Sequence, residues 1–398
     1  MGKPFQQGEQ AMSRGWIMTG VLFIALVGIG LTISSKSPIQ NDEHYTQVAS
    51  IHHLSYVDQI SGRIPEGGNA PLFYFLQKLF LQVIHYQTPA QWLQQRWDND
   101  AGSQIALRII PVICMSLSVV LVFHYFCRSY SLGIGFYSLF IYFSSYMLWA
   151  YWAQARPYAL LVFLTTAQSV VFLKGLEKCP GTNRDKSWVM LAGINLLLGL
   201  TSTLSLGEIL AVSAIWWAFK ERDWKKYIWI TLLPVLIVLF YYAYAPKYQF
   251  YFGLSPEQLI RDNVSRDRFD IVFIFLILLA VDGWRRKIQW SKPAIGEEIK
   301  KPLPYLIFMA LVLASSAAVL GLFALHAKPG QGFAISSRYF IYLTPIGVFA
   351  TTLLTVSLVR SFSKYRLLQW ILAGLFVLVL SQRFIKIFPK IMYFMRGG

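Results

Sequence analysis

Long apolar runs with almost no charge constrain this sequence more than any other feature. Four runs of about 19–24 residues, each with at most one charged side chain, cover residues 15–34, 105–127, 132–150 and 303–326. An α-helix of about 20 apolar residues spans the ~30 Å hydrocarbon core of a bilayer. The runs therefore predict an all-α fold, a polytopic transmembrane helical bundle.

The composition agrees with a membrane protein and argues against three other classes. Apolar residues make up 56% of the chain, charged residues only 14%, and the mean hydropathy is +0.48. Soluble domains carry about 25% charged residues. A net charge of +17 can indicate nucleic-acid binding, but here the basic residues are expected to anchor cytoplasmic loops, so no nucleic acid is predicted as a partner. Three cysteines are too few for a disulfide framework.

The apolar segments divide a single domain, residues 1–398, into about eleven predicted spans. These spans are 15–34, 105–127, 132–150, 157–176, 188–203, 205–220, 227–246, 270–284, 303–326, 338–358 and 367–387. The N-terminal span lacks a small-residue cleavage site, so we expect it to stay as an anchor.

Basic residues set the predicted orientation of the spans. With the N-terminus in the cytoplasm, the inner segments hold about 20 basic and about 8 acidic residues, and the outer segments about 12 and about 11. This asymmetry predicts a multi-pass protein of the inner (plasma) membrane whose first loop, residues 35–104, is extracytoplasmic. An odd number of spans also puts the basic C-terminal segment, residues 383–396, on the outer side.

The first loop contains a shorter apolar segment at residues 71–86, which is too short for a span. Its apolar side chains share one helical face, and its polar side chains share another. The apolar face consists of Leu72, Phe75, Leu76, Leu79 and Val83, and the polar face of Lys78, Gln82 and His85. We expect an interfacial helix that covers the bundle and holds residues 41–45 near the lipid surface.

Two adjacent carboxylates, Asp42 and Glu43, come soon after the first span. A carboxylate here is a candidate general base, which takes the proton from an attacking hydroxyl and accelerates the reaction about 10²–10⁴-fold. A purely structural explanation also fits, in which Asn41 or Asp42 caps the next helix and Glu43 is solvated.

Two further stretches lie at predicted helix ends. Residues 67–74, Gly-Gly-Asn-Ala-Pro-Leu-Phe-Tyr, provide a turn and a helix start, which is sufficient to explain them. Residues 152–159, Trp-Ala-Gln-Ala-Arg-Pro-Tyr-Ala, join two spans on the outer side, and Pro157 suits the first turn of a helix. Arg156 would then reach toward lipid phosphate, or hold the phosphate of a lipid-linked substrate through a two-pronged contact.

Five short segments follow one another in a characteristic order: 42–43, 69–74, 107–111, 153–159 and 337–339. In this order they resemble the GT-C superfamily of membrane glycosyltransferases, which includes protein mannosyltransferases and the aminoarabinose transferases of lipid A. Bacterial members look like Asp-Glu after the first span, His-Pro-Pro-Leu-Tyr-Tyr, Leu-Arg-hydrophobic-Pro, Gln-Glu-Ala-Arg-Pro-Tyr-Ala and a late Arg-Tyr. The similarity covers roughly residues 41–180 and is thin afterwards. This chain departs from the pattern at Asn69, Ala70 and Gln154, which bears on its substrate, on any metal site and on activity.

The resemblance implies a reaction and roles for these residues. Such enzymes take a sugar from a polyprenyl-phosphate carrier on the outer face, usually with inversion, and pass it to a lipid, glycan or protein acceptor. By resemblance, Asp42 is the catalytic base and Glu43 orients the acceptor or assists. The arginines neutralise the departing phosphate. The expected substrate-binding residues are Asn69, Tyr74, Gln154, Arg156, Tyr158, Lys328, Arg338 and Tyr339.

Other features leave alternatives open. His44, His52 and His53 accompany the carboxylates and, with Glu43, are a candidate divalent-metal site, although their spacing is not diagnostic. Glu208 lies near the outer end of a predicted span, and we expect it in a short outer loop and not facing a cavity. A polytopic transporter or lipid flippase would have a similar composition, but its charged or broken helices should lie at the midplane.

Overall fold

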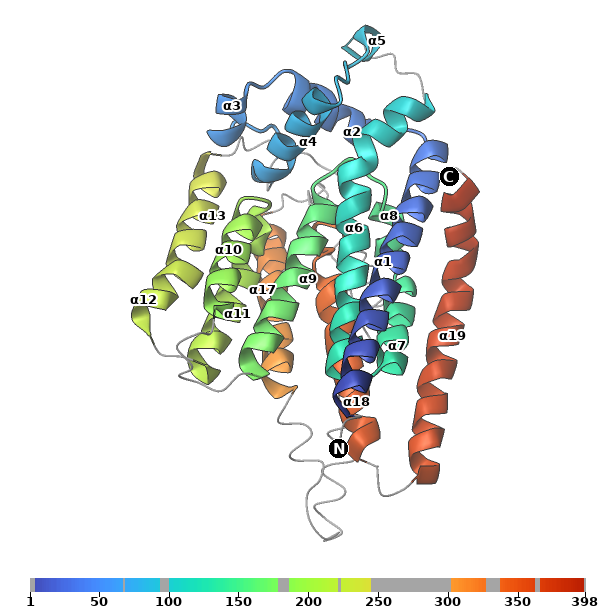
Figure 1. The fold of residues 1–398 in the computed structure, drawn as a ribbon. Coiled ribbons are helices and arrows are strands. Elements are labelled where there is room, and N and C mark those ends of the chain that lie inside the picture. The colour runs from blue at the N-terminus through green and yellow to red at the C-terminus, as the bar shows by residue number, and fades with distance from the viewer. Residues whose placement is uncertain are drawn as a thin grey trace.

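A computed structural model gives the fold of the chain. It describes residues 4–66, 69–93, 100–177, 186–220, 223–244, 302–326, 337–361 and 366–396. These residues form helices and no β-strand, apart from an isolated antiparallel bridge between Asn69 and Ser202. The all-α prediction is therefore confirmed for the described part of the chain (Figure 1).

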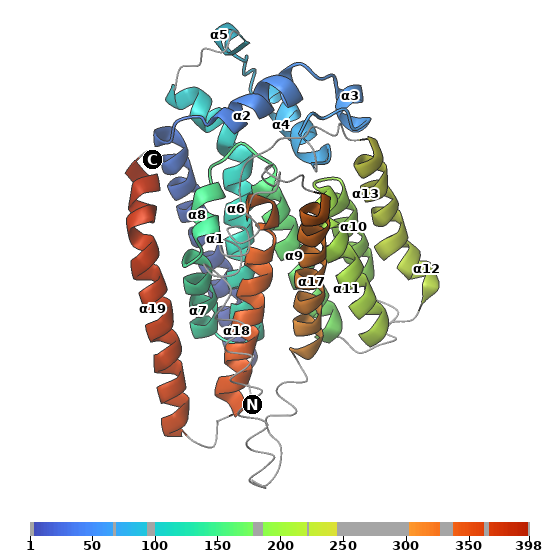
Figure 2. The ribbon, with the colours of Figure 1, turned by 180° about the vertical axis from the view of Figure 1, so that it is seen from behind.

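The longer helices lie side by side in one bundle, seen from opposite sides in Figures 1 and 2. They are α1 (Pro4–Lys36), α6 (Ala101–Ser129), α7 (Leu132–Phe143), α9 (Tyr158–Glu177), α10 (Ser187–Gly199), α11 (Leu206–Phe219), α13 (Leu233–Tyr244), α17 (Leu303–His326), α18 (Leu343–Ser361) and α19 (Arg366–Arg396). Short elements connect them: α8 (Tyr146–Tyr151), η2 (Thr203–Ser205), α12 (Trp224–Tyr227), η3 (Ile228–Leu232) and η5 (Ser337–Phe340).

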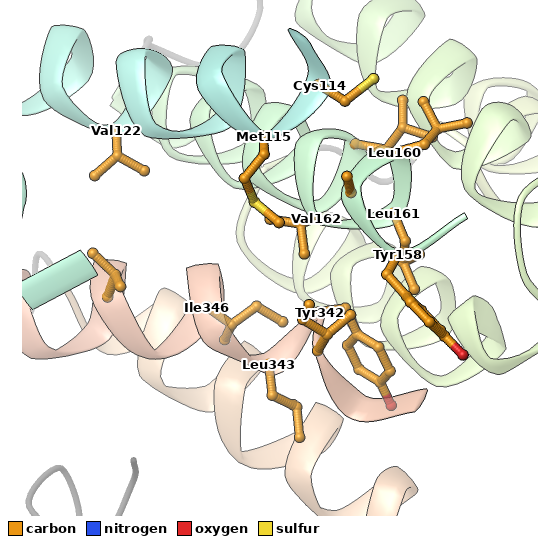
Figure 3. Packing of buried hydrophobic residues seen from close by; sticks show 14 of the residues in the cluster. Cys114, Met115, Val122, Tyr158, Leu160, Leu161, Val162, Tyr342, Leu343 and Ile346 are labelled. Atoms are coloured by element: carbon orange, nitrogen blue, oxygen red, sulfur yellow. The ribbon is translucent and has the colours of Figure 1, made fainter. Parts of the chain in front are cut away.

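The core of the bundle lies around α6 and α9. Helix α6 packs against α1, α7 and α9, and α18 packs against α7 and α9. Figure 3 shows Met115 of α6 and Val162 of α9 facing Ile346 of α18, and all three side chains are buried. Helices α10 and α11 also pack against α9, and being surrounded by four helices explains why most of its side chains are buried.

Polar side chains of α9 are buried together with its apolar ones. These polar side chains form hydrogen bonds with polar side chains of neighbouring helices. The Gln168 amide donates to Asn195 of α10 (2.8 Å), and the Ser169 hydroxyl lies 2.9 Å from the hydroxyl of Tyr305 in α17. Hydrogen bonds of this kind are needed because a buried polar group without a partner is costly.

Four helical segments of the described part are long and apolar enough, by length and composition, to cross a membrane. They are Trp16–Lys36, Ala101–Ser129, Tyr158–Glu177 and Trp224–Tyr244, and they coincide with the predicted spans at 15–34, 105–127, 157–176 and 227–246. Other apolar helices are shorter, among them Ser187–Gly199 and Thr203–Phe219. The predicted span at 270–284 lies outside the described residues.

The prediction of one continuous span over residues 132–150 is wrong. Helix α7 ends at Phe143 and α8 begins at Tyr146. The hydroxyl of Ser144 donates to the Ile141 carbonyl (2.7 Å), and the Trp149 indole donates to the Phe143 carbonyl (2.8 Å). These side chains donate to carbonyls that backbone N–H groups would bind in a continuing helix. Because such bonds do not alter the apolar composition, composition alone did not reveal the break.

The first loop covers one end of the bundle as a layer of short helices (Figure 1, top). It contains α2 (Asn41–Tyr45), η1 (Thr46–His52), α3 (Tyr56–Ile60), α4 (Leu72–Val83) and α5 (Ala90–Leu93). The C-terminus lies at this end and the N-terminus at the opposite end, in both views. We call the covered end the loop end.

A helix is present at the predicted place, α4, but the side chains that it buries in the protein are not those of the predicted apolar face. Phe73, Tyr74 and Gln77 are buried, whereas Leu79 and Val83 of the predicted apolar face are exposed. The Gln77 amide donates to the Leu107 carbonyl of α6 (2.8 Å). A polar side chain can thus lie on the packed face when a backbone carbonyl satisfies it, which hydropathy alone does not register.

Candidate functional site

Helix α2 turns Asp42 and Glu43 in different directions. Gln40, and not Asn41 or Asp42, is the N-cap, and its backbone N–H donates to Glu43 Oε2 (3.0 Å). Because an α-helix has 3.6 residues per turn, adjacent side chains point about 100° apart. Glu43 therefore points into the bundle, and Asp42, with 41% of its side chain exposed, lies at the loop-end surface.

Glu43 and Arg108 form a fully satisfied buried ion pair. Two N–H groups of Arg108 donate to the Glu43 oxygens (2.9 and 2.6 Å), and the Ala155 N–H donates to Glu43 Oε1 (2.7 Å). The other Arg108 donors reach the carbonyls of Ser34, Ser37 and Pro38 at the end of α1 (3.0, 2.6 and 2.9 Å). A guanidinium has five N–H donors and a carboxylate about four acceptor sites, so neither group has bonding capacity left.

This pair is an anchor between the first loop and the bundle. Glu43 is 1% exposed and Arg108 2%. With both groups buried and saturated, Glu43 has no free oxygen to orient an acceptor, which leaves the assisting role of the two that the resemblance implies. Glu43 instead holds α2 against α6 and the start of α9, and in this way it positions Asp42.

Asp42 faces two arginines from distant parts of the sequence. Arg338 of η5 donates through Nη1 to Asp42 Oδ2, and Arg156 Nη1 lies 3.9 Å from the same oxygen. Arg156 Nη1 also donates to the Asp42 backbone carbonyl (3.0 Å). The fold therefore brings together three residues to which the resemblance assigns roles.

Glu66 is a further member of this group that the sequence analysis missed. Its Oε2 lies 3.1 Å from Arg156 Nη2, and its Oε1 accepts a hydrogen bond from the Ser50 hydroxyl (2.9 Å). Burial lowers the pKa of the Arg156 guanidinium, but the negative charge of Glu66 beside it outweighs this, and the pKa is raised above its usual value. The sequence gives only one signal for Glu66, an acidic residue directly before the Gly67-Gly68 turn.

Arg156 and Arg338 each have a buried donor that no described residue binds. The Nε of both residues is buried and has no hydrogen-bond partner among the described residues. A buried donor without a partner costs free energy, so such a group in a native site requires an explanation. Two guanidinium groups with unused donors beside one carboxylate are suited to bind a further anion.

A small pocket, with room for about one water molecule, adjoins the arginines. It is lined by Asn69, Pro157, Tyr158, Leu161, Thr201, Ser202 and Tyr339, three of which were predicted to bind substrate. The hydroxyl of Tyr158 accepts from Arg156 Nη2 (3.3 Å), and the Arg338 guanidinium lies over the Tyr339 ring, 5.6 Å from its centroid. The pocket and the arginine pair are thus parts of one site.

The far wall of the pocket comes from the turn between α10 and η2, which the sequence analysis did not single out. The backbone N–H groups of Ala70 and Leu72 donate to the carbonyls of Thr201 (3.0 Å) and Leu200 (2.8 Å). These bonds hold Asn69 beside Ser202. The predicted turn at residues 67–74 therefore also brings a distant part of the chain to the site.

Two more predicted residues lie behind or beside the pocket. Tyr74 is fully buried and accepts a hydrogen bond from the Asn69 amide (3.0 Å), and burial together with the charge of Glu66 raises its pKa well above the usual value. Gln154 donates to the Gln40 side chain (3.2 Å) near the surface. Tyr74 supports Asn69 from behind, and Gln154 borders the site. Lys328 lies outside the described residues.

The predicted metal group does not come together. Glu43 is saturated by Arg108, and His44 Nε2 lies 3.0 Å from the Trp92 carbonyl. His52 and His53 contact each other edge to face. Within the described ranges, no three His, Cys, Asp or Glu residues are grouped as metal ligands. The residues present in this part of the chain do not offer the donor set that the metal hypothesis requires.

The prediction that Glu208 lies in a short outer loop is wrong. It lies in the first turn of α11, is fully buried, and accepts a hydrogen bond from the Thr165 hydroxyl at Oε2 (3.1 Å). Leu161 lines the pocket, and Thr165 follows it one helical turn further along α9. Glu208 is therefore a carboxylate inside the bundle, bonded to a residue that lies one helical turn from the pocket lining.

Comparison with known proteins gives no family for this chain. No protein-family model matches the sequence, and no curated protein matches it. Its function is therefore inferred from the geometry around Asp42.

Proposed function

We propose that this protein is a membrane glycosyltransferase. It would move a sugar from a polyprenyl-phosphate-linked donor to a lipid, glycan or protein acceptor on the extracytoplasmic face. One observation carries the proposal: the half-exposed carboxylate of Asp42 contacts Arg338 and faces Arg156 next to a pocket at one end of a helical bundle. This arrangement pairs a candidate base with two cations suited to a leaving phosphate, and it agrees with the resemblance to the GT-C superfamily.

The bundle would cross the plasma membrane about eleven times, with the loop end outside. The distribution of basic residues supports this orientation. Helices that end away from the loop end carry Arg128, Lys174 and Arg360 in their last turns, and α12 carries Lys225 and Lys226. Because cytoplasmic loops are enriched in Lys and Arg, this end would face the cytoplasm. The site would then lie where a lipid-linked sugar can be reached from outside.

In the proposed reaction, Asp42 takes the proton from an acceptor hydroxyl. The hydroxyl oxygen forms a bond to the anomeric carbon, and the bond between that carbon and the carrier phosphate breaks. The electron pair of the broken bond stays on the phosphate oxygen, next to Arg156 and Arg338. Proton removal and charge stabilisation at the leaving group are both needed because neither partner is reactive by itself.

The charges of the site remain balanced through this reaction. Before transfer, the three carboxylates of Asp42, Glu43 and Glu66 match the three guanidinium groups named above. Transfer converts the carrier phosphate from a diester to a monoester, which carries about one more negative charge. Asp42 loses its negative charge at the same step because it accepts the proton. The net charge of the site therefore stays the same through the transfer step.

A polytopic transporter or lipid flippase is the second candidate. Glu208 favours it, because a carboxylate inside a bundle often belongs to an ion or substrate path. The group around Asp42 favours the transferase, because its charges lie at the surface of the loop end and beside a pocket.

Purified protein in liposomes separates the two functions. The vesicles contain a radiolabelled polyprenyl-phosphate-linked sugar, and released polyprenyl phosphate and any solute movement are measured. The transferase proposal predicts release by the wild type, with a loss of about 10²–10⁴-fold in Asp42→Asn. Asp58→Asn is the matched control, because it removes the same charge from the same loop at a residue paired with Arg63. Solute movement without release would support the transporter.

A further inference from the structure

The Asp42 carboxylate occupies the place where a phosphate would bind. One of its oxygens, Oδ2, is shared between Arg338 and Arg156, which come from η5 and from the segment before α9. A phosphate bound between these two guanidinium groups would contact the same N–H donors. Phosphate and Asp42 therefore compete for one set of partners.

The site has more capacity for an anion than Asp42 uses. The buried Nε groups of Arg156 and Arg338 have no partner in the described part of the chain. Asp42, near the start of α2, offers the two oxygens of a single carboxylate on a short side chain. A phosphate has more acceptor oxygens and can bind donors that the carboxylate leaves unused. A phosphate group would satisfy more of this site than Asp42 does.

The carboxylates of Glu43, Glu66 and Asp42 differ in how easily each can move away from its arginine partner. Glu43 is 1% exposed and saturated by Arg108 and backbone N–H groups. Glu66 is held by the Ser50 hydroxyl and Arg156 and is buried. Asp42 is 41% exposed. Only the Asp42 side chain can rotate away without exposing a buried charge to an apolar environment.

Arg156 would keep its position during such an exchange. Its Nη1 donates to the backbone carbonyl of Asp42 (3.0 Å), which does not move when the Asp42 side chain rotates. Its Nη2 is held by Glu66 and by the Tyr158 hydroxyl. The anion site therefore remains assembled while its internal carboxylate leaves.

We propose that Asp42 is the internal occupant of a phosphate-binding site formed by Arg156 and Arg338, and that a phosphate-bearing donor displaces it. This inference rests on the proposed function for the identity of the donor, but not for the competition itself. Displacement frees Asp42 from Arg338, so Asp42 can accept a proton only after the donor has bound. The donor thus binds before the acceptor in a productive cycle.

Phosphate binding to variants of the purified full-length protein tests the competition. Inorganic phosphate and farnesyl phosphate, a short prenyl monophosphate, are titrated in detergent by calorimetry. Asp42→Asn removes the competing charge and keeps the shape, and we expect it to bind both ligands at least about tenfold more tightly than the wild type. Arg338→Gln should weaken binding at least about tenfold. Asp58→Asn should bind like the wild type, because Asp58 lies with Arg63 away from the site.

The two probes separate a headgroup site from a site that also needs lipid. Tighter binding of both probes to Asp42→Asn supports a site for the phosphate group itself. Tighter binding of farnesyl phosphate alone supports a site in which the lipid chain contributes. Equal or weaker binding of both to Asp42→Asn would overturn the proposal.

If Asp42→Asn does not fold, a second variant and a kinetic measurement still test the proposal. Asp42→Ser also removes the charge and should bind more tightly, and unchanged binding by a folded Asp42→Ser would overturn the proposal. In the wild type, initial rates should show the donor binding first, and acceptor-first binding would contradict the order. If no donor is turned over but Asp42→Asn binds phosphate more tightly, the proposed function fails and the competition stands.

Discussion

Two neighbouring residues, Asp42 and Glu43, enter two ion pairs of opposite character. Glu43 and Arg108 are almost completely buried and use every donor and acceptor that they have. Asp42 is partly exposed, and its partners Arg156 and Arg338 retain buried donors that have no partner among the described residues. We call Glu43 and Arg108 the closed pair, because all their donors and acceptors are used. We call Asp42 with its two arginines the open pair, because some of their donors have no partner among the described residues.

The comparison shows that saturation separates a structural ion pair from a candidate site. Removing one partner of a buried pair is costly because the other charge is left without compensation, but such a pair has nothing to offer a ligand. An unsaturated pair at a surface contributes less to stability and can exchange partners. The closed pair holds α2 in place, and the open pair next to it is free to do chemistry.

Arg108→Leu should have the largest effect on stability. It leaves Glu43 buried without its cation, and it frees three carbonyls at the end of α1. We expect a loss of about 3–5 kcal/mol, measured by thermal and denaturant unfolding in detergent. The double variant Glu43→Gln/Arg108→Leu should recover part of the loss, because no buried charge remains. A change below about 1 kcal/mol in the single variant would contradict a closed pair.

Glu66→Gln should have a moderate effect, on activity more than on folding. The amide can keep the bond to Ser50 but loses the charge that holds Arg156. Without this ion pair Arg156 would be less firmly positioned beside the phosphate, so we expect kcat for sugar transfer to fall about tenfold. The control Ser50→Ala frees the other oxygen of Glu66 without a charge change and should stay within about twofold of the wild type.

A merely structural role of Glu66 would give a different pattern. Loss of stability in Glu66→Gln with unchanged kcat and unchanged phosphate binding would remove it from the site. The expected pattern is a lower kcat together with altered phosphate binding, because Arg156 would be less firmly held.

Glu208→Gln should have the smallest effect on sugar transfer. Glu208 lies inside the bundle, where it accepts a hydrogen bond from the Thr165 hydroxyl. The amide oxygen of a glutamine can accept the same hydrogen bond. We expect transfer within about threefold of the wild type, since no reacting group changes and the hydrogen bond is retained. The control Thr165→Val removes that hydrogen bond from the other side. A near-complete loss of function in Glu208→Gln would shift the balance toward transport.

Much of the fold could be predicted from the sequence because it depends on composition. Runs such as 15–34 and 105–127 are apolar over their whole length, and they lie within α1 and α6, although α1 begins well before its predicted start. Breaks within an apolar run were not predictable in this way. The end of α7 at Phe143 depends on side-chain bonds of Ser144 and Trp149, which leave the hydropathy unchanged.

The candidate site was predictable only where local motifs carried it. Asp42, Arg156 and Arg338 were identified from short segments at predicted helix ends, and the fold brings them together. Glu66 was missed because its partner Arg156 is far away in sequence and its own surroundings contain only turn residues. The pairing of Glu43 with Arg108 likewise depends on which way a short helix turns its side chains.

The central claim is that the open pair at Asp42 performs group transfer while the closed pair at Glu43 keeps the site in place. Its most direct test measures thermal unfolding and polyprenyl-phosphate release on the same purified sample of Asp42→Asn. The account predicts a melting temperature close to that of the wild type with release lowered about 10²–10⁴-fold. Release by Asp42→Asn at the wild-type rate would contradict it.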